Sequence, residues 1–393
     1  MRHTYHPNRR YSLQMKNVVE EIDSVVAHLI ESLERKRESS GPTGLEINAD
    51  DLVGRFTTDL VFSCFYKQYN VIDYEKEVDY YSNLVHSGID SLTHPAIEVA
   101  VWMPFLKPLI LWYTEHIHPI KETFAEILKF ITNQTRLNLE ATKQMTEMKN
   151  AGVEFDPDDF VMKDGTRFKR NLVDAFIESF REGRLTKDEY TNSAYVLFMA
   201  GIRTTADGLS KLLYELATHQ EVQNKLRRSI MKDGIDSEYM VWCINEALRL
   251  HPPAPIGCSR IVERDMELER GTGIVPRGTF IFTPAHVIHK MPEYWGPDAN
   301  LYRPERWQDA KSFHPMQFIP FGHGRRMCPG REFAMFEMKK LLMTIIPRYT
   351  IDRCSKTSDT MSLKSPYHTF NVYDNPTYIK LRKITNTSAQ EKS

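Results

Sequence analysis

The sequence predicts an α-dominated fold with a small β part, treated as one domain over residues 1–393. Three observations predict it. Apolar residues recur at helical spacing through the first two thirds of the chain. Short strand-like segments bounded by Gly and Pro follow residue 250. No internal repeat or clear linker divides the chain, and residues 385–393 are expected to form a disordered tail.

The first helix is predicted from an apolar face that includes Met15, Ile22 and Leu33. The charged, Gly- and Pro-containing run 34–44 ends it. Further helices are predicted at 49–66 and from 119 to about 148. The polar segment 150–167 is predicted to be a loop.

The longest predicted helix runs from Thr186 to Thr218, where Thr186 and Glu189 have the spacing of a capping box. Its apolar stretch 194–201 is typical of a helix buried in mid-protein. Gly201 costs about 1 kcal/mol relative to Ala there, which indicates either close packing or a ligand groove. The remaining predicted elements are a helix at 237–250, strands at 265–268 and 279–283, and a helix from 331 to before Pro347.

Charge and composition exclude several classes of protein. Lys and Arg total 51 against 52 for Asp and Glu, so bulk electrostatic binding to nucleic acid is not expected. Five cysteines make no disulfide framework and favour a reducing compartment. The most apolar stretch, 97–113, is interrupted by charges and prolines, and no signal peptide is apparent.

The segment from Phe321 to Gly330 carries the strongest chemical signal. It places Cys328 in a loop rich in Gly and Pro, directly before a predicted helix, with Arg325 and Arg326 close by. A thiolate there gains from the helix dipole and free backbone N–H groups, which suits an axial iron ligand. The alternative is a buried structural Cys; zinc fits poorly because the other cysteines form no C-x₂-C pair.

This segment resembles the haem-binding signature F-x-x-G-x-R-x-C-x-G of the cytochrome P450 family, through Phe321, Gly324, Arg326, Cys328 and Gly330. Five such matches would arise by chance on the order of once in 10⁴ chains of this length. The resemblance implies the cytochrome P450 fold and haem b, with Cys328 as the thiolate ligand of the iron.

Other segments resemble further motifs of that family. Glu246 and Arg249 match its E-x-x-R, and Arg306 would complete a Glu–Arg–Arg cluster with a structural role, although a surface ion pair is the alternative for the first two. Arg260 resembles the arginine that binds a haem propionate, as would Arg326; the alternative for Arg260 is a solvated strand charge.

Residues 200–205 resemble the family pattern A/G-G-x-D/E-T-T/S. Gly201 would let haem and oxygen approach, and Thr204 matches the threonine of oxygen activation; its alternative is a hydrogen bond to a carbonyl one turn earlier. Arg203 stands at the acidic position and cannot release a proton near neutral pH. It either faces outward while water carries protons, or binds a substrate carboxylate, or marks a member that rearranges peroxides.

The resemblance implies a monooxygenase that inserts one oxygen atom of O2 into an apolar lipid, steroid or xenobiotic. Electrons would come from an NADPH-linked flavin reductase docked near Cys328, where Lys339 and Lys340 add positive charge. Residues 214–226 resemble eukaryotic microsomal members. That likeness implies the cytosolic face of the endoplasmic reticulum membrane, with surface contact near 97–113 or, alternatively, a core helix pair there.

The start of the chain corresponds to the middle of a helix of the family, so an N-terminal part with the membrane anchor is expected to be missing. Arg2 would be a further haem-propionate arginine. Two alternatives follow. Arg203 favours a haem-thiolate isomerase or dehydratase of a lipid peroxide, and the missing segment favours a non-catalytic remnant.

Overall fold

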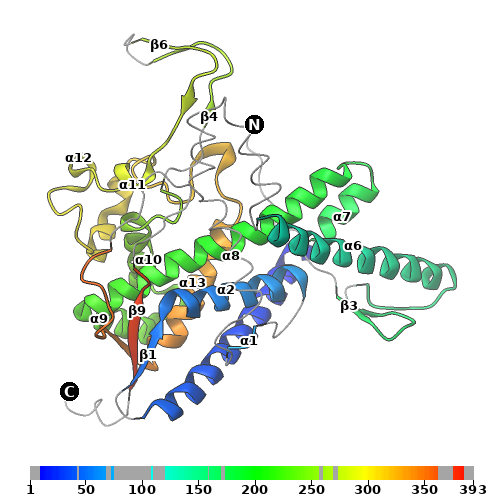
Figure 1. Cartoon of the computed structure of the whole chain (residues 1–393), viewed down its shortest axis with the longest axis horizontal. Helices are drawn as coiled ribbons and strands as arrows, with labels where there is room; N and C mark the ends of the chain where they lie inside the picture. Colours follow the sequence, from blue (N-terminus) through cyan, green and yellow to red (C-terminus); the bar gives the residue numbers. More distant parts are fainter. Residues whose placement is uncertain are drawn as a thin grey trace. The chain divides into compact units, whose positions relative to one another are not determined.

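The structure is a computed structural model, and Figure 1 shows its course from the N-terminus to the C-terminus. It describes residues 9–41, 44–67, 72–74, 108, 120–157, 159–169, 173–255, 260–268, 273–361 and 375–384. The described chain is mainly helical with small antiparallel sheets, which confirms the predicted fold class. Arg2, the tail 385–393 and all of 97–113 except Pro108 lie outside the described residues.

The chain forms two compact units. The first comprises Met1–Lys36 and Gly54–Arg203, and the second comprises Arg37–Val53 and Thr204–Ser393. The helices α1 (Arg9–Ser40), α2 (Ala49–Tyr66) and α8 (Lys187–Thr218) contribute residues to both. The prediction of one domain over 1–393 therefore stays a prediction. In the described ranges, no helix is both long and apolar enough to span a lipid bilayer.

An aromatic cluster forms the core of the first unit. Phe62 and Tyr66 of α2 meet Phe130 of α6 (Ile120–Asn150) and Phe198 of α8, with ring centroids 4.9–6.2 Å apart. The Tyr66 hydroxyl donates a hydrogen bond to the Ala194 carbonyl at 3.3 Å. Burial raises the pKa of Tyr66. Side chains of three sequence-distant helices thus close one apolar core.

The segment 150–167 contains structure that the loop prediction missed. Strands β2 (Asp159–Val161) and β3 (Arg167–Lys169) pair antiparallel, with Phe160 opposite Phe168. Both rings pack around Ala141 in the C-terminal half of α6, and Figure 1 shows the hairpin beside that helix. The prediction was wrong because each strand is only three residues long and has a single buried residue, its aromatic one. The helix α7 (Asp174–Arg181) follows.

The second unit is built on a sheet in the order β1–β9–β8, with antiparallel neighbours. Ile47 lies opposite Ile379, and Ile351 opposite Leu381, so apolar side chains line one face. Gln223 joins this sheet to a helix, because its amide bonds both the N–H and the carbonyl of Ile351. The elements are β1 (Leu45–Asn48), α9 (Gln220–Asp233), η2 (Gly234–Asp236), α10 (Glu238–Leu250), β4 (Arg260–Ile261), β5 (Met266–Glu267), β6 (Ile274–Val275), β7 (Phe280–Ile281), α11 (Ala285–Ile288), α12 (Pro292–Trp295), η4 (Pro304–Ser312), η5 (Gly324–Arg326), α13 (Arg331–Ile345), β8 (Tyr349–Asp352) and β9 (Tyr378–Lys383).

The second half of α8 is held in this unit by polar and apolar contacts. Asp50 accepts hydrogen bonds from Ser210 at 2.5 Å and from the Thr377 amide at 2.7 Å, and pairs with Lys211 at 3.2 Å. Burial alone would raise the pKa of Asp50, but these partners outweigh it and lower the pKa. A methyl group at Gly208 would come within 2.8 Å of Met338 Cε, so α13 packs closely on α8.

The sequence-predicted ends of the main helices agree with the structure. The α2 bounds match the predicted 49–66, and α10 and α13 match within about one residue. The capping box at the start of α8 is present: Glu189 N–H donates to Thr186 Oγ1 at 3.2 Å, and Thr186 N–H donates to Glu189 Oε2 at 2.8 Å. Strands β5 and β7 lie inside the predicted strand segments.

Candidate functional site

The loop that carries Cys328 is closed by its own backbone. Cys328 N–H donates to the Phe321 carbonyl at 2.8 Å, and Met327 N–H donates to the Gly324 carbonyl at 3.1 Å. Gly322 and Gly324 have φ values of 73° and 74°, which favour glycine because a Cβ is strained there. These turns leave Cys328 solvent-exposed, so its predicted alternative as a buried structural Cys is wrong.

The space beside the Cys328 sulfur is kept open by Gly330. This residue is the N-cap of α13 and, as a glycine, supplies no side-chain cap to the helix. A methyl group at Gly330 would lie 3.8 Å from Cys328 Sγ, in van der Waals contact with it. An exposed sulfur next to the N-terminus of a helix suits an anionic sulfur ligand, because the helix dipole is positive there. The surroundings of Cys328 therefore fit its predicted role as the thiolate ligand of a haem iron.

A buried ion cluster centres on Glu246, whose side chain is fully buried, as is that of Arg249. Arg249 donates to both carboxylate oxygens, at 2.9 and 2.8 Å, in the bidentate geometry expected of this pair. Arg306 Nε donates to Oε1 at 2.7 Å and Trp307 Nε1 to Oε2 at 3.0 Å. The structure thus brings together the three residues of the predicted Glu–Arg–Arg cluster, and the surface ion pair proposed as an alternative is wrong.

The two arginines of the cluster also fasten backbone carbonyls. Arg249 donates to the carbonyls of His289, Ala299 and Leu301 at 2.5–3.1 Å. Arg306 donates to the Trp295 and Asp298 carbonyls at 3.2 and 3.1 Å. The Glu246 carboxylate therefore binds two guanidinium groups, and these groups bind the backbone of the irregular segment 289–301.

His289 extends these bonds to the loop that carries Cys328, and sequence reasoning missed it. Its carbonyl accepts from Arg249, and its Nε2 accepts from the Ile319 amide at 2.9 Å. The Ile319 carbonyl in turn accepts from the Gly322 amide at 3.0 Å. Burial and the nearby Arg249 lower the pKa of His289 to about 3, so the ring stays neutral and Nε2 can accept. A buried His outside any motif gave no signal in the sequence.

The two predicted propionate arginines lie on separate elements of the second unit. Arg260 is exposed in β4, opposite Ile281 of β7. Arg326 is exposed at the end of η5, two residues before Cys328. Exposed guanidinium groups suit ligand carboxylates, and their shared role stays a prediction.

The predicted residues of α8 divide between the units. Gly201 and Arg203 belong to the first unit, and Thr204 to the second, as does Cys328. A methyl group at Gly201 would meet Val61 Cγ2 at 3.2 Å and Phe65 Cε2 at 3.3 Å. Close packing against α2 therefore accounts for Gly201, the first of its two predicted explanations. Arg203 and Thr204 are both half-buried.

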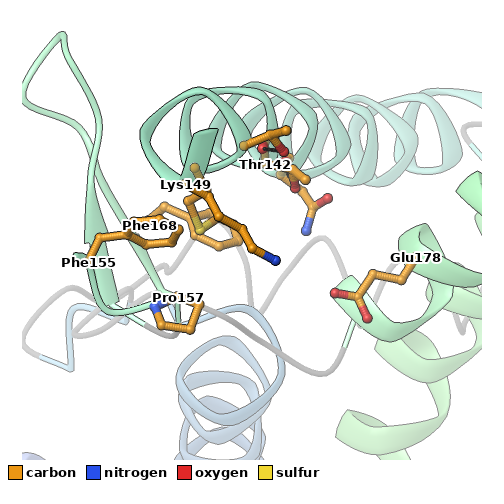
Figure 2. A pocket seen from close by; sticks show the side chains of 9 residues that line it. Thr142, Lys149, Phe155, Pro157, Phe168 and Glu178 are labelled. Carbon is orange, nitrogen blue, oxygen red and sulfur yellow. Dashed lines mark hydrogen bonds between the residues drawn. The ribbon is translucent and has the colours of Figure 1, made fainter. Parts of the chain in front are cut away.

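A separate pocket of about 370 Å³ lies in the first unit. Figure 2 shows Thr142 and Lys149 of α6, Phe168 of β3 and Glu178 of α7 around it, with the Lys149 and Glu178 side chains directed into the opening. Phe155 and Pro157 add an apolar wall. No residue of the predicted haem site lines it.

Comparison with known proteins identifies relatives along most of the chain. The family model described as "Cytochrome P450" matches residues 1–381. Cytochrome P450 3A29 of Sus scrofa is 25% identical over 375 residues, covering 88% of this chain and 67% of the relative. Lithocholate 6-beta-hydroxylase of Mesocricetus auratus is 25% identical over 374 residues, covering 90% and 67%. Cytochrome P450 3A13 of Mus musculus is 33% identical over 193 residues, covering 46% and 37%. The alignments thus span from about a third to two thirds of these relatives.

Proposed function

Because the chain belongs to the cytochrome P450 family, we propose that it acts as a haem-thiolate monooxygenase on an apolar organic substrate. One oxygen atom of O2 enters the substrate and the other leaves as water. The observation that carries the proposal is the exposed Cys328 sulfur in a glycine-bounded loop at the N-terminus of α13. When bound, haem b supplies the oxygen chemistry, and its thiolate ligand favours cleavage of the O–O bond.

The roles proposed for the chain's own residues follow from their surroundings. Cys328 would hold the iron, and the positive end of the α13 dipole would stabilise the negative sulfur. Arg260 and Arg326 bind the two haem propionates. Thr204 on α8 would hold a proton on its hydroxyl and pass it on. Glu246, Arg249 and Arg306 keep the segment before the loop in place, through His289 and Ile319.

The proposed electron donor is a flavin-containing reductase that uses NADPH. It would dock on the positive surface around the Cys328 loop, where Arg325, Lys339 and Lys340 add cationic charge. Lys339 Nζ donates to the Ile235 carbonyl at 3.4 Å, which leaves its ammonium charge in place. The proposed location, by the likeness to the eukaryotic relatives, is the cytosolic face of the endoplasmic reticulum membrane. The substrate class proposed is a lipid, steroid or xenobiotic.

The test is the reduced carbon monoxide spectrum, in which a thiolate-ligated haem absorbs at about 450 nm. The wild type reconstituted with haem should show this band, and Cys328→Ala should lose it. Cys354→Ala is the matched control, because Cys354 is another free, partly exposed cysteine in the same unit and should keep the band. A wild type without the band would refute the proposal and favour the non-catalytic remnant.

Arg203 supports a second candidate, a haem-thiolate isomerase or dehydratase of a lipid peroxide. A half-buried guanidinium at this position cannot deliver a proton as a carboxyl does. Such an enzyme needs no external electrons. Product formation from a lipid hydroperoxide without NADPH and reductase would establish it, whereas product that requires both would establish the monooxygenase.

A further inference from the structure

The pocket of the first unit is a cavity that the proposed haem chemistry does not use. Its walls come from the C-terminal half of α6, from β3, from α7 and from the segment 155–157. Its volume of about 370 Å³ lies within the range of about 300–1,000 Å³ that is typical of small-molecule sites. All of these walls belong to one compact unit, so the cavity is a feature of that unit alone.

One side of the cavity is apolar. Figure 2 shows Phe155, Pro157 and Phe168 together on this side. Phe155 and Met145 pack against the same hydrophobic cluster to which Phe168 belongs, so the core between α6 and the hairpin of β2 and β3 holds them in place. Aromatic rings fixed in this way suit the flat apolar group of a ligand.

The polar atoms of α6 at the cavity are acceptors whose own donors are already used. Thr142 Oγ1 donates to the Asn138 carbonyl and Thr146 Oγ1 to the Thr142 carbonyl, both at 2.8 Å. Asn138 is 3% exposed, and its Nδ2 donates to Asp174 Oδ1 at 2.7 Å. Asn138 Oδ1 has no hydrogen-bond partner among the described residues. Because buried amide oxygens are normally hydrogen-bonded, this wall favours a ligand that brings a donor.

Two side chains of opposite charge are directed into the opening from different helices, Lys149 from the end of α6 and Glu178 from α7 (Figure 2). Lys149 is exposed and Glu178 is half-buried. A ligand with a single charge would match only one of these groups. A molecule with both an ammonium and a carboxylate group matches both through charge-assisted hydrogen bonds, and its ammonium is also a donor for the acceptors of α6.

We infer that this cavity binds a zwitterionic molecule of amino-acid to dipeptide size with an aromatic side chain. The ring lies against Phe155 and Phe168, the ammonium group pairs with Glu178, and the carboxylate pairs with Lys149. The site is independent of the proposed monooxygenase chemistry, because the residues that line it include none of the predicted haem site.

The first experiment is calorimetric titration of the full chain with L-phenylalanine and with glycyl-L-phenylalanine, in which the two charges lie further apart. We expect saturable binding of at least one of them. The N-acetylated form of the tighter-binding compound lacks the ammonium group, and its C-terminal amide lacks the carboxylate. Each of these two forms should bind about tenfold more weakly. Glycylglycine, which has both charges and no ring, should bind more weakly as well.

The second experiment assigns each charge to its partner. Glu178→Gln should remove the preference for the free amine over the N-acetylated form, and Lys149→Met should remove the preference for the free acid over the amide. Glu182→Gln and Lys143→Met are the matched controls, because both residues are exposed near the same helices and do not line the cavity. Both control variants should keep the affinities of wild type.

Two results would overturn the inference. One is the absence of saturable binding by both phenylalanine compounds in wild type. The other is an unchanged preference for free over blocked termini in Glu178→Gln and Lys149→Met. Failure of the proposed function looks different, because it removes the carbon monoxide band at about 450 nm and leaves these titrations unaffected.

Discussion

Glu246 shows at the scale of a single residue how a short motif becomes a buried cluster. One carboxylate accepts from Arg249, Arg306 and Trp307, and its Oε1 also accepts from the Arg303 amide at 3.0 Å. Five N–H groups of four residues, from two segments, converge on two oxygens without solvent access. Removal of the carboxylate therefore leaves Arg249 without its counter-ion and Arg306 with only Asp298, at 3.4 Å.

We expect Glu246→Ala to lower the free energy of unfolding by about 3–5 kcal/mol, because it breaks a buried pair from one side. Urea unfolding followed by circular dichroism measures the change. Glu332→Ala is the control, because its exposed pair with Arg331 should contribute less than about 1 kcal/mol. A loss of less than about 1 kcal/mol in Glu246→Ala would show that the cluster is not structural.

At this scale the sequence predicts some site residues well and others not at all. The bidentate pair of Glu246 and Arg249 follows from i,i+3 spacing on a helix. The turn around Cys328 follows from Gly322 and Gly324, which the structure places at positive φ. His289 could not be found, because its role depends on burial by segments far away in the chain.

Helix α8 illustrates the scale of the element, because its start depends on a local reciprocal cap. Thr186 and Glu189 exchange backbone and side-chain hydrogen bonds, and Thr186 also donates its hydroxyl to Glu189 Oε2 at 2.9 Å. The bond from the Thr186 amide is the main cause that lowers the pKa of Glu189. Such a cap satisfies amides that a helix leaves unpaired.

We expect Thr186→Ala to destabilise the protein by about 1 kcal/mol, because the Glu189 amide loses its acceptor. Thr186→Ser keeps the hydroxyl and should remain within about 0.5 kcal/mol of wild type. Thermal unfolding of the three proteins at equal concentration provides the comparison. Equal losses in the Ala and Ser variants would mean that the cap does not stabilise α8.

Helices with a strong apolar periodicity were predictable from the sequence. Strands that are recognised only by their pairing with distant segments were not. The α2 and α10 patterns give their bounds because apolar spacing and stop signals are local. The strands β8 and β9 were not predicted, since each is recognised only by its pairing across the sheet. The hairpin of β2 and β3 was missed for the same reason, because its two aromatic residues gain meaning only against α6.

At the scale of the whole molecule, Glu215 is a source of the loss of unfolding free energy that we expect at acidic pH. This carboxylate on α8 pairs with His251 at 2.7 Å and with His219 at 3.3 Å, and its side chain is largely buried. Burial alone would raise its pKa, but the hydrogen bonds from His219 and His251 outweigh it and lower the pKa to about 2. The stabilisation is therefore present above the ordinary Glu pKa and is lost as pH falls towards 2.

We expect Glu215→Gln to flatten the fall of unfolding free energy between about pH 4.5 and 2, where wild type should lose about 3 kcal/mol more than the variant. Denaturant unfolding at several acidic pH values measures this slope. Glu147→Gln is the control, because the lowered pKa of Glu147 arises at an exposed pair with Lys163. Identical slopes in wild type and Glu215→Gln would exclude this carboxylate as the source.

The hydrogen bonds through His289 have a consequence for the order in which the protein is assembled. The turn that presents Cys328 receives its support from Ile319, His289 and Arg249, so it acquires its final shape only after residues 246–319 have folded. If the chain binds haem as proposed, the Cys328 turn would be ready to hold the iron only once this segment is in place. A chain with an unfinished 289–319 segment would then remain without haem.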